Sequence, residues 1–195
     1  YKESKILLKG IDLSNNDTSL VKAGWSKGNI TPDFPAKIVG FGKNVDFSGV
    51  MDSLFVRSIV FEQKHKRYLY LSYDLMIIHP YLVHAVEERL SENGLNFDGV
   101  YYTATHTHNG LGGYGDKLSG LIALGGIDNN VIDLLTLKTL ESAKESIRNL
   151  SVVSYNYGDF LSDNLVKNRL DKESGRVDAY VRVLQLKNEK SERLS

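Results

Sequence analysis

The fold can be worked out from residues 99–114, which read Gly99-Val100-Tyr101-Tyr102-Thr103-Ala104-Thr105-His106-Thr107-His108-Asn109-Gly110-Leu111-Gly112-Gly113-Tyr114. Residues 99–102 are a short apolar run, which is typical of a buried strand. A polar segment with two histidines follows, and then the chain becomes rich in glycine. The stretch therefore predicts a buried strand that ends in a glycine-rich loop. Functional side chains are often carried by loops that a rigid scaffold holds in place.

The two histidines of this loop, His106 and His108, are candidate site residues. In an extended backbone, residues i and i+2 point to the same side, so both imidazoles can converge just past the strand end. One ring can bind a metal ion, and the other can bind the same ion or serve as a proton donor or base. The alternative is that paired histidines on a polar loop have no special role. The strand-end position and the glycines favour a functional site.

The remaining strands and helices follow from local patterns. Runs of β-branched and aromatic residues predict strands at 20–26, 54–61, 67–73, 151–157 and 177–186, and 54–73 resembles a hairpin. One helix should begin at Pro80 and end at Asn93-Gly94, and Asp128 should cap another of about 20 residues. The order predicts an α/β layered domain with a mixed β-sheet flanked by helices, spanning residues 20–195 after a polar lead-in at 1–19.

A long segment after the predicted central strand, one aspartate and three further histidines each have a functional or a structural interpretation. The segment 105–126 is expected to be a long loop, which is usually functional or disordered. Asp74 directly follows a predicted strand, so it either faces an active crevice or caps a turn. His79 and His84, at the start of a predicted helix, are expected to be structural. His65, at the tip of the predicted hairpin, is expected to be solvated.

Composition excludes several classes of protein. The chain has 195 residues, 42% of them hydrophobic and 25% charged, which is ordinary for one globular domain or part of a larger one. It carries 24 basic and 24 acidic residues, and it lacks the basic stripe of a nucleic-acid binder. No apolar run is long enough to span a membrane. There is no cysteine, which excludes disulfides and thiolate zinc sites. Nothing in the sequence predicts an oligomeric state.

Five blocks of sequence occur in an order that resembles a known family. They are residues 23–32, 40–42, 51–57, 72–75 and 104–114. Together they resemble the N-terminal region of the neutral/alkaline non-lysosomal ceramidase family, from about residue 21 to residue 186. The resemblance implies a zinc amidase that cleaves the N-acyl bond of ceramide to give sphingosine and a fatty acid. It also implies a small-molecule lipid or amide substrate.

The resemblance assigns roles to three residues. His106 is expected to bind zinc, and His108 to stand beside the metal and contact the reacting groups. Arg169, in the pair Asn168-Arg169, is expected to line the same site. The sequence departs from the family at Asn109 and Leu111, where serine and proline are usual, so the shape of the loop can differ.

The family completes its zinc site with a histidine, a glutamate and a tyrosine, and uses a serine near the metal, all beyond the Asn-Arg pair. No histidine follows His108 in this sequence. We therefore expect residues 20–195 to be the N-terminal part of a catalytic domain, or a truncated homologue. Two readings stay open: a zinc-dependent hydrolase of ceramide or of another amide or ester, and a non-catalytic, ceramidase-like binding or surface protein. Family members are commonly exported, and a chain that begins at Tyr1 rather than methionine fits a periplasmic, cell-surface or extracellular location.

Overall fold

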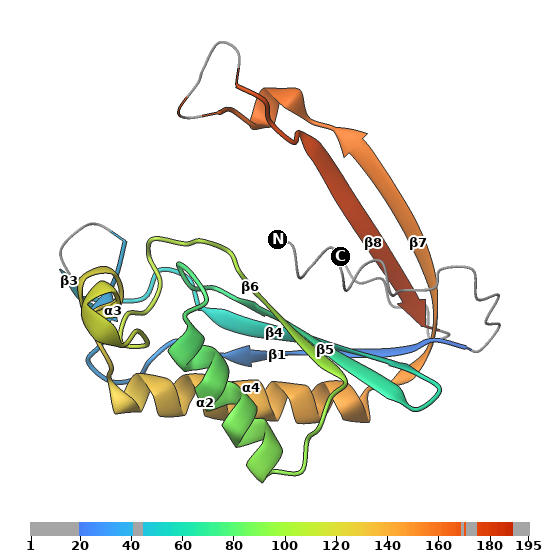
Figure 1. Ribbon diagram of the computed structural model, residues 1–195, viewed down its shortest axis with the longest axis horizontal. Coiled ribbons are helices and arrows are strands. Elements are labelled where there is room, and N and C mark those ends of the chain that lie inside the picture. Colours follow the sequence, from blue (N-terminus) through green and yellow to red (C-terminus); the bar gives the residue numbers. More distant parts are fainter. Residues whose placement is uncertain (1–19, 41–44, 169, 171–174, 189–195) are drawn as a thin grey trace.

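The computed structural model describes residues 20–40, 45–168, 170 and 175–188 (Figure 1). Its longer strands are β1 (Lys22–Asn29), β4 (Phe55–Gln63), β5 (Lys66–Tyr73), β6 (Gly99–Ala104), β7 (Ser151–Leu161) and β8 (Tyr180–Asn188). Two short strands, β2 (Lys37–Ile38) and β3 (Val45–Asp46), pair with each other. The helices are α2 (Pro80–Glu92), α3 (Lys117–Leu124), α4 (Asn129–Arg148) and the 3₁₀ helix η1 (Asp163–Leu165).

The long strands form one sheet in the order β6-β5-β4-β1-β7-β8. β5 and β6 run parallel and the other neighbours are antiparallel, so the predicted mixed sheet is confirmed. β4 and β5 make the predicted hairpin, in which Gln63 pairs with Lys66. Parallel neighbours need a crossover connection, and α2 supplies it between β5 and β6. Because β5 and β6 are parallel, their C-terminal ends lie side by side at the same end of the sheet.

Local signals place both long helices where the sequence predicts them. Pro80 occupies the first turn of α2, and the His79 side chain accepts a hydrogen bond from the Tyr81 amide at 3.3 Å. His79 is thus structural, as predicted. Asp128 caps α4 by accepting a hydrogen bond from the Asn130 amide at 2.9 Å. Figure 1 shows α2 and α4 on the same side of the sheet.

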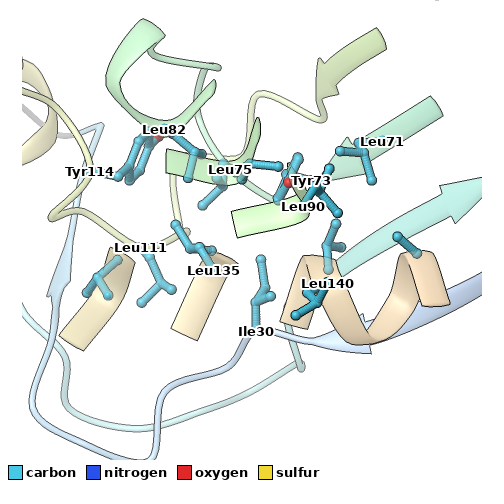
Figure 2. Close-up of a cluster of buried hydrophobic side chains, with 14 of the residues drawn as sticks. Ile30, Leu71, Tyr73, Leu75, Leu82, Leu90, Leu111, Tyr114, Leu135 and Leu140 are labelled. Carbon is cyan, nitrogen blue, oxygen red and sulfur yellow. The ribbon is translucent and has the colours of Figure 1, made fainter. Parts of the chain in front are cut away.

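The hydrophobic core lies between these two helices and the sheet (Figure 2). Each layer contributes fully buried side chains, among them Val60, Leu71 and Tyr73 from the sheet and Leu82 and Leu135 from the helices. Leu111 and Tyr114, from the loop after β6, belong to the same cluster. The histidine loop is therefore fixed to the core by its own apolar residues.

Two parts of the fold differ from the prediction. Segment 105–126 contains the helix α3 rather than loop alone. The i, i+3, i+4 spacing of Leu118, Leu121 and Ile122 is a helical signal that the prediction did not use. These three side chains are exposed, and Gly120 and Leu124 face the core instead. β7 and β8 extend away from the rest of the sheet as a two-stranded ribbon, and β7 pairs with β1 only at Lys22 and Ala23 (Figure 1). In the part of the chain that the structure describes, no helix has the length and hydrophobicity needed to cross a bilayer.

Candidate functional site

The structure brings His106 and His108 together just past the end of β6. Their Nε2 atoms lie 3.4 Å apart, and the ring planes meet at 79°. Both side chains are exposed, so the pair faces the surface. The backbone is not extended as expected, because His106 has a φ of 60°, in the left-handed region. The histidines therefore meet through a turn at His106 rather than through the alternation of a strand.

Each ring is held by a backbone carbonyl from a different part of the chain. The His106 Nδ1 lies 2.7 Å from the Met76 carbonyl oxygen, and the His108 Nδ1 lies 2.8 Å from that of Gly40. A carbonyl oxygen only accepts hydrogen bonds, so each Nδ1 carries the proton and donates it. In the neutral ring the Nε2 atom then carries the lone pair. Histidines that bind metals are usually oriented by such a bond from the other ring nitrogen.

The geometry of the two Nε2 atoms fits a bound cation. Two neutral rings of this tautomer turn their lone pairs toward each other, and a proton or metal ion between them stabilises that arrangement. Two nitrogens bound to one tetrahedral zinc ion at about 2.0–2.1 Å lie about 3.4 Å from each other. Among the described residues, no group of three or more His, Cys, Asp or Glu side chains is placed to hold a metal ion. These residues therefore fit part of a zinc site and contribute two nitrogen donors.

The carbonyl that holds His106 belongs to a well-anchored segment after β5. Asp74 begins this segment, and its Oδ2 atom accepts a hydrogen bond from the Phe55 amide at 2.9 Å. Arg57 Nη1 lies 2.9 and 3.0 Å from the two carboxylate oxygens of Asp74. Leu75 is fully buried next to it. The Asp74 carboxylate therefore fixes the start of the segment that carries Met76, which favours a structural role over the active-crevice alternative.

Tyr114 is a buried residue near the backbone of the same segment. Its side chain is fully buried, and its hydroxyl lies by the backbone amides of Ile77 and Met76, although no hydrogen bond to it meets ordinary geometry within the described residues. Burial raises the pKa of the Tyr114 phenol to about 12, and the two amides oppose that rise. Tyr114 is therefore a neutral phenol near pH 7.

The segment that holds His108 is attached to the histidine loop itself. The Gly112 amide donates to the Lys37 carbonyl at 2.8 Å, and the Val39 amide donates to the Gly110 carbonyl at 3.3 Å. Ile38 forms a bridge with Leu111. Sequence reasoning missed Met76 and Gly40 as supports, because each acts through its backbone carbonyl and so leaves no side-chain signature.

Arg169, the third predicted site residue, lies outside the described residues. Its neighbour Asn168 is described, and its side-chain oxygen accepts a hydrogen bond from the Leu170 amide at 2.9 Å. The structure thus places two of the three predicted residues, and the role of Arg169 stays a prediction.

A cavity of about 420 Å³ lies beside the histidine loop. Thr107 and Asn109 line it, and neither histidine does. Its apolar lining includes Ile38, Phe47, Val50, Met51, Leu54 and Leu111. The loop that carries the two histidines therefore also lines the cavity, and most of the cavity lining is apolar.

Comparison with known proteins supports the resemblance seen in the sequence. The family profile described as neutral/alkaline non-lysosomal ceramidase, N-terminal, matches residues 22–169. No curated protein sequence matches the chain.

Two solved structures have the same fold. Neutral ceramidase from Pseudomonas aeruginosa has a TM-score of 0.77 at 21% identity over 91% of this chain, and a structure described as ceramidase complexed with C2 has a TM-score of 0.76 at 21% identity over 90%. The match covers 31% of the first of these chains and 30% of the second, so this chain spans about a third of their length. Because the family profile matches most of the sequence, the chain belongs to the neutral/alkaline non-lysosomal ceramidase family, in its N-terminal region.

Proposed function

We propose that the chain is part of a zinc-dependent amide hydrolase of the ceramidase type. The observation that carries this proposal is the pair of histidines whose Nδ1 atoms donate to fixed carbonyls while their Nε2 atoms converge at 3.4 Å. The pair lies inside the region that the family profile matches. Family membership supports hydrolase chemistry, and the activity of the whole enzyme is inferred from it.

Each candidate residue has a distinct role in this proposal. His106 would hold the zinc ion through Nε2. When bound, zinc polarises an amide carbonyl and lowers the pKa of bound water to about 7. His108 would hydrogen-bond the reacting oxygen, or accept and return a proton, through its own Nε2. Arg169 would stabilise developing negative charge. The Met76 and Gly40 carbonyls would keep both rings in the tautomer that these roles require.

The proposed substrate is a lipid amide such as ceramide, which family membership supports. The mostly apolar cavity beside the loop is compatible with an apolar chain. A hydrolase of another amide or ester is a variant of the same chemistry. Because members of the family are commonly exported, we also propose a periplasmic, cell-surface or extracellular location.

We propose further that residues 20–195 form the N-terminal part of a catalytic domain rather than a complete site. A catalytic zinc normally has three protein ligands and an open position, and in this proposal the described residues supply one of those ligands, His106 Nε2. The remaining ligands would come from residues that the structure does not describe or from further sequence of a longer protein.

A non-catalytic binding or surface protein is the second candidate. The observation in its favour is the lack, among the described residues, of a third acidic or imidazole side chain beside the histidine pair. Such a protein would keep the fold and the paired histidines without supporting hydrolysis.

The first experiment measures zinc per chain by elemental analysis after dialysis. It compares the 195-residue chain with His106→Ala, His108→Ala and the control His84→Ala, because His84 is exposed on α2. Because the described residues supply only part of the ligand set, we expect less than one zinc per chain in the wild type and the control, and none in His106→Ala. Loss of zinc in His108→Ala as well would make His108 a second ligand. Zinc retained in His106→Ala would refute the assignment.

The second experiment tests activity with an N-acylsphingosine whose fatty acid is labelled. The gene product that binds zinc is assayed for release of the labelled acid, with His108→Ala and His84→Ala alongside. Release that depends on His108 supports the hydrolase. If a longer product of the gene binds zinc but releases no labelled fatty acid, the result supports the non-catalytic binding protein.

A further inference from the structure

Gly40 stands in unusually close contact with His108. Its carbonyl oxygen accepts the hydrogen bond from His108 Nδ1 at 2.8 Å. A Cβ atom added at Gly40 would lie 2.8 Å from the Cβ, Cγ and Nδ1 atoms of His108. These His108 atoms belong to the ring and its attachment point, so a side chain at position 40 would clash with the imidazole.

The backbone conformation of Gly40 adds a second constraint. Its φ is 112°, a value that residues with a Cβ rarely adopt. The same conformation turns the carbonyl toward the His108 ring. Position 40 must therefore combine an absent side chain, a left-handed φ and a carbonyl aimed at Nδ1.

Neither partner can readily move to relieve a clash. The backbone before Gly40 is tied to the histidine loop through Lys37–Gly112 and Val39–Gly110 hydrogen bonds, and Val39 is buried in the core. Leu111, three residues after His108, is buried in the same core. The contact between Gly40 and His108 is thus set between two anchored segments.

We propose that Gly40 is a positioning residue that sets the ring orientation and tautomer of His108. Its carbonyl keeps the proton on Nδ1, and its lack of a side chain lets the ring lie against the backbone. The orientation of Nε2 toward His106 follows from both. The effect on hydrolysis rests on the proposed function, whereas the effect on the imidazole itself does not.

The test is nitrogen-15 NMR of the histidine rings in the zinc-free 195-residue chain, which reports which ring nitrogen carries the proton. Gly40→Ala is compared with Gly94→Ala, whose φ is 70° and whose added Cβ would meet no atom within 4 Å. This control also has a positive φ, and it lies away from the site. His106 serves as an internal reference, because Met76 rather than Gly40 holds its ring.

We expect His108 to be protonated at Nδ1 in the wild type and in Gly94→Ala. In Gly40→Ala we expect its ring signals to shift and Nε2–H to become populated, while His106 changes less. In the zinc-loaded catalytic product, Gly40→Ala should lower kcat by about 10–100-fold with a smaller change in KM, as for other residues that orient site histidines.

Unchanged His108 signals in folded Gly40→Ala, or equal changes in Gly94→Ala, would overturn the proposal. If Gly40→Ala does not fold, the wild-type spectrum decides, because a His108 ring that carries a proton on Nε2 and none on Nδ1 would rule out the Gly40 bond. Absence of hydrolysis by the wild type would refute the proposed function and leave the NMR result on Gly40 intact.

Discussion

The Nε2 atoms of His106 and His108 lie 3.4 Å apart although their rings are held by separate segments of the chain. Met76, in the segment after β5, holds one ring, and Gly40, just after β2, holds the other. The site therefore depends on three loops that meet at one edge of the sheet. Changes in any of them should alter the pair, and the supporting residues can be tested separately.

Replacement of Asp74 should weaken the segment that carries Met76. Asp74→Ala removes the partner of Arg57 and leaves the half-buried Phe55 amide without its acceptor. We expect a loss of about 1–3 kcal/mol in the free energy of unfolding, measured by urea denaturation. Glu141→Gln is the control, since its ion pair with Lys138 is exposed and should contribute less than about 1 kcal/mol. Equal losses in the two variants would contradict the anchoring role of Asp74.

The left-handed backbone at His106 should carry a measurable strain. A residue with a Cβ in this conformation costs on the order of 1 kcal/mol relative to glycine. We therefore expect His106→Gly to be about 1 kcal/mol more stable than His106→Ala in thermal or urea unfolding, although neither should bind zinc. Lys64 has a φ of 56°, so the pair Lys64→Gly and Lys64→Ala calibrates the effect away from the site. Equal stability of the two His106 variants would mean that φ is not strained there.

Tyr73 of β5 and Thr139 of α4 share a buried hydrogen bond, and loss of its donor should cost less stability than loss of its acceptor. The Thr139 hydroxyl donates to the Leu135 carbonyl at 2.7 Å, so the Tyr73 hydroxyl must donate to Thr139 Oγ1, 2.8 Å away. Tyr73→Phe should cost about 1 kcal/mol, because Thr139 keeps its own acceptor. Thr139→Val should cost more, about 1–3 kcal/mol, because it leaves the fully buried Tyr73 hydroxyl without a partner. Urea denaturation of both variants measures the difference, and a larger loss in Tyr73→Phe would reverse the assigned direction.

Acid should remove the contribution of Glu62 to stability. The hydrogen bond from Arg67, with help from Lys22, lowers the pKa of the Glu62 carboxyl below its ordinary value. A lowered folded-state pKa contributes stability above the ordinary pKa, and the contribution is lost as the pH falls through the folded pKa. Glu62→Gln should therefore cost about 0.5–1 kcal/mol at pH 7, and the gap should narrow as the pH falls below about 4.5.

This pH dependence is measured by urea unfolding of the wild type and Glu62→Gln at about pH 7 and at a pH below about 4.5. Glu88→Gln, at an exposed position on α2, is the control and should show little gap at either pH. A gap between Glu62→Gln and wild type that stays constant with pH would contradict the ionic origin of the effect.

The sequence determined the elements whose signals are local. The hairpin around Gln63 and Lys66 follows from two strand-forming runs with a polar turn between them. The start of α2 follows from Pro80, which has no amide hydrogen to leave unpaired in the first turn. The start of α4 follows from Asp128, whose side chain accepts a hydrogen bond from a first-turn amide. The sequence also placed two histidines directly after a strand, and the ordered family blocks identified the family that the profile confirms.

Tertiary structure decided how those histidines are held. Their supports lie 30 and 68 residues away in sequence and act through backbone carbonyls, which every residue has and no pattern distinguishes. The turn at His106 likewise depends on how the loop packs against the core rather than on local periodicity. Residue types can show which side chains are chemically able to bind a metal. Only the packing of distant segments sets their tautomer and the distance between them, because both depend on contacts that form when the chain folds.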